Sequence, residues 1–340
     1  MAEARRTWGS AEYLALIGLP LLALELWTLV AWLADGPSQV TQYRDHGDPS
    51  WFAAHTFEVL ALCGSVAMLV FIVRGCLRER RILTFDAMYC LAAATIFYLG
   101  VANDFHPVFL ESSNFINLNN PCGHMPFVVN PDCGRVPDAI VFWWLTQTFC
   151  FLWLAVGATR IVPRIRSRWP RLSTAQLVLL LGLVGAVFDL FLEAGIAIPL
   201  HLWSYAPLPG LKLLGSHGFR YPVIVMIPNG IWIGGMMAVR CLRNDRGERF
   251  VERGLEHHSR ARRRIITLMA LYGFFQMLTW GINGILMAAG FYQSQWTPTT
   301  AHVLNGVCDA PGVEGTRYGP CPGSPGFRAP GRNSLPGRSP

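Results

Sequence analysis

Two carboxylates stand in one of the most apolar stretches of the chain. Asp189 and Glu193 belong to the run TAQLVLLLGLVGAVFDLFLEAGIAIPL, and their four-residue spacing places both side chains on one face of an α-helix. Burial disfavours the charged form of a carboxyl group, and two neighbouring acids do not ionise together easily. The pair is therefore predicted to offer a proton donor and a proton acceptor on one helical turn, which is acid–base chemistry in an apolar setting.

Polar side chains also interrupt the other apolar stretches. His55 and Glu58 share a helix face at three-residue spacing, and Asn229 follows Pro228 in the middle of its stretch. Such groups are costly at membrane depth and normally face a protein interior or a water-filled cavity. Besides the acid pair, the candidates are Glu25, His55, Glu58, Asn103, Asp104, His106, Asn229, Gln276 and Asn283.

A structural role is the alternative for each of these groups. Glu25 alone could pair two helices, and the acid pair could bond Asn229 or Gln276 for the same purpose. An interhelical polar bond of this kind contributes about 1–2 kcal/mol in a membrane. A fixing role needs one such group rather than two acids on one face, so we favour a functional role for Asp189 and Glu193.

The composition is that of a membrane protein. The 340 residues are 52% hydrophobic and only 14% charged, whereas soluble domains carry about a quarter of charged residues. A spanning helix needs roughly 20 apolar residues. The sequence therefore predicts an all-α bundle of about seven transmembrane helices over residues 1–290, followed by a Cys/Pro/Gly-rich tail over 291–340 that is disordered after about residue 322. The predicted spans are 11–34, 52–73, 83–103, 138–159, 175–200, 220–240 and 265–289.

Positive charge sets the predicted orientation. The N-terminus carries two Arg, the 74–82 loop four, the 160–173 loop five and the 240–264 loop nine. Because Lys and Arg are retained on the cytoplasmic side, the N-terminus is predicted inside. The polar residues then fall mainly in the outer half of their spans, which predicts one cavity opening outward. The outer loops are 35–51, 104–137 and 201–219.

The net charge of +7 is accounted for by this topology and by attraction to anionic lipid. The most basic loop contains acids and lacks aromatic residues interleaved with basic ones, so no nucleic-acid partner is predicted. The predicted partners are the lipid bilayer and a hydrophobic small molecule, and the sequence carries no signal of oligomeric state.

Four of the nine cysteines fall in loops predicted to lie outside, where disulfides form. Cys122, Cys133, Cys308 and Cys321 are predicted to form disulfides, with three possible pairings. A metal site on Cys122 and His124 is the alternative, although no CxxC pair accompanies it. The other five cysteines are predicted to be packing residues.

The sequence shows no serine-nucleophile elbow, phosphate-binding glycine loop, haem-binding pair or two-metal cluster, so no cofactor and no metal are predicted. Tryptophan rings could stabilise a cation in an apolar cavity through their faces. Positions in an interfacial belt are the alternative for these rings. They are Trp143, Trp144, Trp153, Trp203 and Trp232.

Several segments in one order carry a family resemblance. They are RRILTFDAMYCLAAA, NDFHPVFLESSNFINL, RWPRLST, DLFLE, FRYPVIVMIPNGIWIGGMMAVRCLRNDRGERFVERGLEHH and a tail with LNGVC and EGTRYGPCPG. In these segments the chain resembles the AveC-type spirocyclase family, actinobacterial membrane proteins of polyketide biosynthesis. The resemblance extends from about residue 50 to about residue 325.

The resemblance implies an enzyme of antibiotic or related natural-product biosynthesis. Family members convert a ketone flanked by two hydroxyls into a six,six-spiroketal, and some also dehydrate the product. The expected activity is therefore a cofactor-independent cyclase, an isomerase or lyase. The alternatives are an integral-membrane terpene cyclase that protonates an alkene or epoxide, and a non-catalytic lipid or small-molecule transporter or binding protein.

Under the spirocyclase hypothesis, Glu193 is the general acid and Asp189 the general base. Asp104 and Glu58 complete the predicted catalytic group by positioning the substrate or stabilising charge. The predicted substrate-binding residues are Asn229, His106, His55, Gln276 and Glu25.

Overall fold

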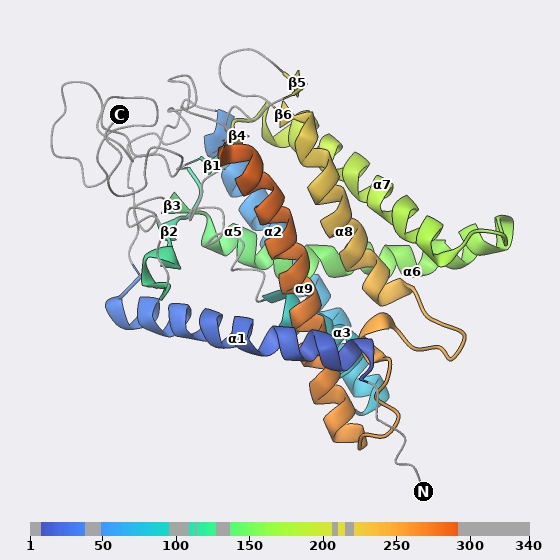
Figure 1. Ribbon diagram of the computed structural model, residues 1–340. Coiled ribbons are helices and arrows are strands. Elements are labelled where there is room, and N and C mark those ends of the chain that lie inside the picture. The colour runs from blue at the N-terminus through green and yellow to red at the C-terminus, as the bar shows by residue number, and fades with distance from the viewer. Residues whose placement is uncertain are drawn as a thin grey trace, which may run out of the picture.

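The computed structural model describes residues 8–37, 49–94, 109–112, 114–126, 137–205, 210–214 and 221–291. Helices make up most of this part of the chain, which confirms the predicted all-α bundle (Figure 1). Among the described residues, six helical segments are long and apolar enough to cross a membrane. These are Ser10–Asp35, Pro49–Glu79, Val141–Arg168, Thr174–Ala197, Val223–Cys241 and Arg260–Ile282.

The third predicted span, 83–103, is described only in its first half. Helix α3 (Phe85–Ala93) begins close to the predicted start, and residues 95–108 lie outside the described residues. The other α-helices of the described residues are α1 (Ser10–Asp35), α2 (Pro49–Glu79), α5 (Ile140–Leu145), α6 (Phe151–Arg168), α7 (Thr174–Leu192), α8 (Met226–Cys241) and α9 (Arg260–Phe291).

Local sequence fixes where two of these helices begin. The Ser173 hydroxyl accepts a hydrogen bond from the Gln176 backbone N–H at 3.2 Å, and the Gln176 side chain accepts one from the Ser173 N–H at 2.8 Å. This reciprocal pair is a capping box at the start of α7. Thr84 is the N-cap residue of α3, as Ser173 is of α7, and its hydroxyl accepts a hydrogen bond from the Ala87 N–H at 3.3 Å.

Close helix contacts depend on glycine. A Cβ atom added to Gly234 of α8 would lie 2.6 Å from the Cα of Gly182 on α7, and one on Gly18 of α1 would lie 2.7 Å from the Met269 carbonyl of α9. Small residues let helix backbones approach in membranes, where burial of apolar surface drives association weakly. Gly182 and Gly234 therefore allow α8 to pack closely against α7, the helix that carries the acid pair.

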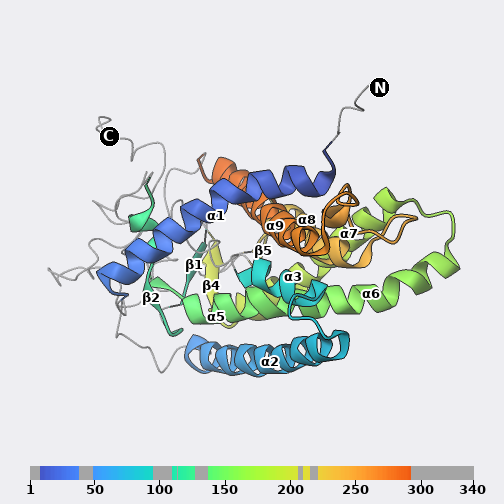
Figure 2. The ribbon, with the colours of Figure 1, turned by 90° about the horizontal axis from the view of Figure 1, so that it is seen from below.

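The first two helices, α1 and α2, pack on opposite sides of the bundle. Helix α1 lies along α9, and α2 lies along α5 and the π-helical segment η4 (Thr146–Cys150) that joins α5 to α6 (Figure 2). Outward side chains such as Leu179 and Leu183 of α7 are exposed, as expected of helix faces that contact lipid.

The segments predicted on the outer face, with the starts of the fourth and sixth predicted spans, lie toward one end of the bundle (Figure 1). They form three two-stranded antiparallel sheets, and the 3₁₀ turn η2 (Pro121–His124) packs beside α1. The pairs are β1 (Phe109–Glu111) with β4 (Trp203–Tyr205), β2 (Leu118–Asn119) with β3 (Pro137–Asp138), and β5 (Lys212–Leu213) with β6 (Tyr221–Pro222).

The segments predicted inside meet at the other end. The Ser10 hydroxyl donates to the Phe250 carbonyl at 2.6 Å, which ties the start of α1 to the 3₁₀ turn η7 (Phe250–Glu252) of the most basic loop. Arg240 Nε, at the end of α8, donates to Asp86 Oδ1 of α3 at 2.8 Å. The N-terminal segment, the start of α3 and the most basic loop thus lie together, as the charge pattern predicts for segments on one side.

Cys122 is disulfide-bonded, so its sulfur is not a metal ligand and the alternative of a Cys122–His124 metal site is wrong. His124 Nε2 instead lies 3.2 Å from Asp35 Oδ2. The remaining predicted disulfide cysteines, at positions 133, 308 and 321, and the tail from residue 292 onward lie outside the described residues. Cys63, Cys76, Cys90, Cys150 and Cys241 are free.

Candidate active site

A cavity of about 330 Å³ lies among α2, α5, η4, α6, α7, α8, α9 and β4. Its walls are mainly aromatic and aliphatic, and only a few oxygen- or nitrogen-bearing side chains other than tryptophan reach it. These are Ser65, Thr146, Asp189, Glu193, Tyr205 and Asn229. A small apolar chamber with a few convergent polar groups is the usual form of a small-molecule site.

Asp189 lies in the cavity wall and is 5% exposed. The Tyr221 hydroxyl donates to its Oδ2 at 2.6 Å, and the Asn229 amide donates to its Oδ1 at 2.8 Å. Tyr221 comes from β6 and Asn229 from α8, so two elements fix the carboxylate that α7 supplies. Both oxygens are engaged, which holds the side chain in one orientation.

Glu193 lies one turn further along the same wall and is 7% exposed. The Tyr205 hydroxyl donates to its Oε2 at 2.5 Å. Burial, together with the neighbouring Glu193, raises the pKa of Tyr205 well above its ordinary value, so this phenol remains a hydrogen-bond donor. The carboxyl of Asp189 and the indole of Trp203 also lie beside Glu193 and interact with it.

Glu193 begins a π-helical segment, η5 (Glu193–Ala197), in which Ile198 N–H bonds to the Glu193 carbonyl at 2.9 Å. The other π-helical segment of the described residues, η4, supplies Thr146, Phe149 and Cys150 to the same cavity. π-helical turns are rare and occur frequently at functional sites. Both spans were predicted as regular helices, and their sequences carry no simple signal for the wider turn.

Aromatic rings surround the two acids. The rings of Phe151 and Trp232 meet edge to face with centroids 4.5 Å apart, and those of Trp143 and Trp203 are 5.5 Å apart. Of the five tryptophans singled out in the sequence, Trp143, Trp153, Trp203 and Trp232 line the cavity, and Trp144 does not. Ring faces of this kind attract a positive charge in a site that excludes water.

Three of the nine predicted site residues, Asp189, Glu193 and Asn229, line this cavity. Glu25 and Gln276 do not. Glu25 Oε2 accepts from the Tyr272 hydroxyl at 2.8 Å and from the Gln276 amide at 3.2 Å, in the interface between α1 and α9. The expectation that these two residues join the acid pair is therefore corrected, because α1 and α9 bury their polar groups against each other.

His55 and Glu58 also lie away from the cavity. His55 Nδ1 lies 3.1 Å from Glu58 Oε2, and Glu58 Oε1 accepts a hydrogen bond from the Ile116 backbone N–H at 2.6 Å. This pair holds the 114–126 segment onto α2, which is why it does not turn toward the acid pair. Asn103, Asp104 and His106, and the side chain of Asn283, lie outside the described residues.

A second buried acid pair was missed by sequence reasoning. Glu111 accepts from Ala139 N–H at 2.7 Å and from the indole of Trp143, and Asp138 accepts from the Asn120 amide at 2.7 Å. Burial raises the pKa of Glu111 well above its ordinary range, and the neighbouring Asp138 adds to the shift. Glu111 lies in a segment predicted as an outer loop, and Asp138 lies at the very start of a predicted span, so neither interrupts an apolar run.

Tyr205 and Tyr221, the donors to the acid pair, were missed as well. Tyr205 follows the acid-bearing span by a short connection, and Tyr221 lies at the start of the predicted span that carries Asn229. Both therefore return to the same end of the bundle as Glu193, which was a usable signal. The phenol type gave no further indication, because tyrosine is common at membrane interfaces.

Fold and site define a helical protein suited to a membrane, with a carboxylate pair in a small aromatic cavity. The chain belongs to the spirocyclase AveC-like family, whose model matches residues 79–299. The matched part includes α7, α8 and the tyrosines that bond the acids, and it confirms the resemblance seen in the sequence. No curated protein and no solved structure matches the chain.

Proposed function

We propose that this protein is a spirocyclase that forms a spiroketal from a dihydroxy-ketone polyketide by acid–base catalysis. The observation that carries the proposal is the placement of Asp189 and Glu193 side by side in the wall of one aromatic cavity, each bonded by a tyrosine. Two acids in contact share one proton more readily than they carry two negative charges. One then serves as an acid while the other serves as a base.

The first step is hemiketal formation. Glu193 gives its proton to the ketone oxygen while the first hydroxyl of the substrate forms a C–O bond to the carbonyl carbon. Asp189, whose oxygens are held by Tyr221 and Asn229, takes the proton of that hydroxyl. The proton passes back to Glu193 through the contact between the two carboxyl groups, which restores the starting state.

The second step closes the spiro centre. Glu193 protonates the hemiketal hydroxyl, which leaves as water, and the remaining cation is spread over carbon and the ring oxygen. The ionised carboxylates and the faces of Trp143 and Trp232 stabilise this cation. The second hydroxyl then adds to the carbon and loses its proton to Asp189. This proton passes back to Glu193 as in the first step, so one water is released and the enzyme returns to its starting state.

The cavity supports this chemistry by orientation. Spiroketals also form in acid without an enzyme, so the protein contributes mainly the geometry in which the two hydroxyls approach. A volume of about 330 Å³ is at the lower end for ligand sites and suits the reacting segment rather than a whole polyketide. Apolar walls exclude bulk water, which would otherwise trap the cation.

We place the protein in the cell membrane as a multi-pass protein with its N-terminus in the cytoplasm. The substrate is a hydrophobic small molecule. The reaction moves only protons and water, so the proposed cyclase works without a cofactor. Dehydration of the product by the same acid pair is a second outcome that this site supports.

Membranes containing the protein, supplied with a dihydroxy-ketone substrate mimic, test the proposal. The expected product is lighter by one water and is enriched in one stereoisomer at the spiro centre. A stereoisomer mixture equal to that from membranes without the protein would contradict it. A cyclised isomer of unchanged mass from a prenyl or epoxy-prenyl substrate would instead support the terpene cyclase alternative.

A further inference from the structure

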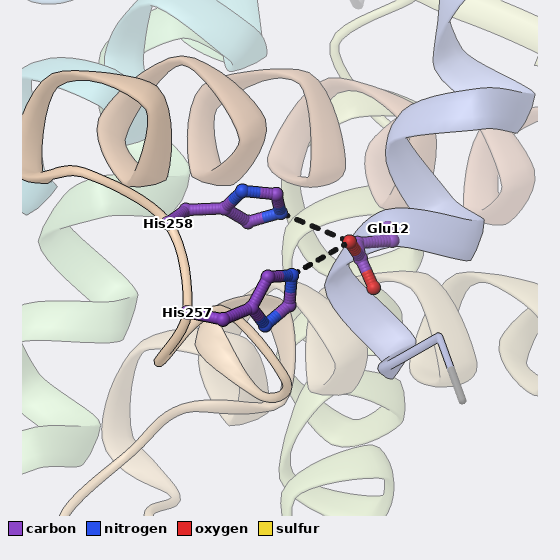
Figure 3. A group of neighbouring side chains, drawn as sticks. All are labelled: Glu12, His257 and His258. Atoms are coloured by element: carbon purple, nitrogen blue, oxygen red, sulfur yellow. Dashed lines mark hydrogen bonds and ion pairs between the residues drawn. The ribbon is translucent and has the colours of Figure 1, made fainter. Parts of the chain in front are cut away.

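Three side chains of metal-ligand type, none of which lines the acid cavity, converge where the start of α1 meets the loop before α9. Glu12 lies in the first turn of α1, and His257 and His258 lie in the loop before α9 (Figure 3). Both imidazole rings point toward the Glu12 carboxylate from the same side. Helix α1 and the loop are more than 240 positions apart in the chain, so the tertiary fold assembles this group.

The spacing of the three ligand atoms fits one metal ion. Glu12 Oε1 lies 3.0 Å from His258 Nε2 and 3.5 Å from His257 Nε2, and the three ligand atoms all lie within 4.8 Å of one another. Ligands about 2.0–2.1 Å from a tetrahedral zinc ion are separated from each other by about 3.4 Å. Both carboxylate-to-imidazole distances are therefore within a few tenths of an ångström of that separation, and rotation of the half-exposed His257 ring can bring the two imidazole nitrogens to it from at most 4.8 Å.

The surrounding structure holds two of the ligands in place. The second oxygen of Glu12 accepts from the Gly9 N–H at 3.1 Å, which leaves the first oxygen directed at the histidines. The backbone of His258 is fixed on both sides, since its N–H bonds to the Leu255 carbonyl at 3.0 Å and its carbonyl accepts from Arg263 Nε at 2.9 Å. A carboxylate anchored by a second hydrogen bond is typical of metal sites.

His257, the third ligand, is exposed enough for an ion to reach the site from solvent. His258 is 4% exposed in its side chain, whereas His257 is 40% exposed. An ion can enter beside His257, and water can complete the coordination. Two histidines, one carboxylate and a water form a set that zinc accepts, and imidazole ligands also suit cobalt and nickel.

We propose that Glu12, His257 and His258 bind a divalent transition-metal ion of the zinc class. The bound ion links the first turn of α1 to the loop that leads into α9, the two helices that pack along each other through Gly18. The site lies away from the acid cavity, so its role is to hold α1 in place. This inference does not depend on the proposed spirocyclase activity.

The test uses the full chain, purified in detergent without a polyhistidine tag and stripped of metal with a chelator. Titration with Zn²⁺ is followed by calorimetry and by thermal unfolding. We expect one ion bound per chain and a higher unfolding temperature with Zn²⁺. Failure to bind Zn²⁺, or binding without any shift in unfolding temperature, would overturn the proposal.

Variants locate the binding. His257→Ala changes a half-exposed side chain, so it should fold normally and weaken Zn²⁺ binding at least about tenfold, the size expected when a metal site loses a supporting group. Glu12→Gln should do the same. His201→Asn, in the outer segments, is the matched control and should bind as the unchanged protein does. Equal Zn²⁺ affinity in His257→Ala and the unchanged protein would overturn the proposal, because the three residues would then only bond to one another.

Substitution of Co²⁺ for Zn²⁺ gives a readout that does not rest on the variants. Visible absorption of a four-coordinate Co²⁺ ion is expected for the unchanged protein, and its loss is expected in His257→Ala. A six-coordinate Co²⁺ spectrum would contradict the proposed ligand set. Spirocyclase activity is expected to be the same with and without the ion in samples that remain folded.

Discussion

Among the described residues, two of the buried carboxylate sites look alike in their bonding and differ in their surroundings. Asp189 and Glu193 accept hydrogen bonds from Tyr221 and Tyr205, and Glu25 accepts one from Tyr272. The acid pair lines a cavity, whereas Glu25 is packed between α1 and α9 and does not line it. A buried acid with a phenol partner is thus not in itself a catalytic feature. Access to a space that a substrate can enter makes the difference.

The largest expected effect comes from the acid pair. Glu193→Gln and Asp189→Asn keep the shape of each side chain but remove the exchangeable proton or the base, so each should slow cyclisation by about 10²–10⁴-fold. The measurement is the rate at which membranes containing each variant form the product that is lighter by one water. The double variant should be little slower than either single variant, because the two residues act as one unit.

Thermal unfolding supplies the control for these variants. Glu193→Gln keeps an acceptor for Tyr205, so its unfolding temperature should stay close to that of the unchanged protein. A loss of rate that is matched by a loss of folded protein would assign the acid pair to stability rather than to catalysis.

The second effect concerns Glu25 and has the opposite character. Glu25→Ala removes the acceptor that Tyr272 and Gln276 share, at a cost of about 1–3 kcal/mol in the free energy of unfolding. Glu25→Gln keeps an acceptor oxygen and should cost less. Unfolding in detergent measures both. If folded Glu25→Gln loses its cyclisation rate, the separation of the two sites is wrong.

The sequence predicted the helical class and the acid pair for the same physical reason. A long apolar run requires a helix in a membrane, and a carboxylate within such a run requires a partner or a cavity. The sequence therefore predicted that Asp189 and Glu193 lie on one face, and the structure has both in one wall. It did not predict which other polar residues would join them. Glu25, His55 and Glu58 satisfy the same rule with partners of their own.

What could not be predicted depends on contacts between distant segments. The positions of Tyr205 and Tyr221 beside the spans return them to the end of the bundle that holds Glu193, but no local pattern in the short strands β4 and β6 encodes their bonds to the acids. The π-helical turn at Glu193 is set by tertiary packing as well. Glu111 and Asp138 were missed because their burial is created by the outer strands rather than by an apolar run.

A smaller effect is expected from the tyrosines. Tyr205→Phe and Tyr221→Phe each remove one hydrogen bond to an acid, worth about 1.5–3 kcal/mol when the acceptor is charged and less when it is neutral. Cyclisation should slow by about tenfold or more in both. Tyr272→Phe, at the Glu25 site, is the matched control. A similar slowing in all three variants would show that the effect is general destabilisation.

The smallest effect is a pH dependence at Asp138, at the end of the bundle that is predicted to face outward. Burial raises the pKa of Asp138 from its ordinary 3.8 to about 7, so the folded protein holds a proton that the unfolded chain releases. This contribution to stability is complete below about pH 4 and is lost as the pH rises to about 7. Glu111 shifts in the same direction.

Acidification from pH 7.5 to 5.5 should therefore raise the unfolding temperature of the unchanged protein relative to Asp138→Asn, by a few degrees. Thermal unfolding of both proteins across this range measures the difference. A constant difference between them at all pH values would exclude a protonated Asp138 in the folded state.

The most direct test of the account compares Glu193→Gln with Glu25→Gln in one assay of stereoisomer ratio at the spiro centre. Both substitutions turn a buried, tyrosine-bonded acid into an amide, and only one of the two residues lines the cavity. The account predicts that Glu25→Gln yields the enriched stereoisomer and that Glu193→Gln yields the mixture formed without protein. Equal stereoisomer ratios from the two variants would contradict it.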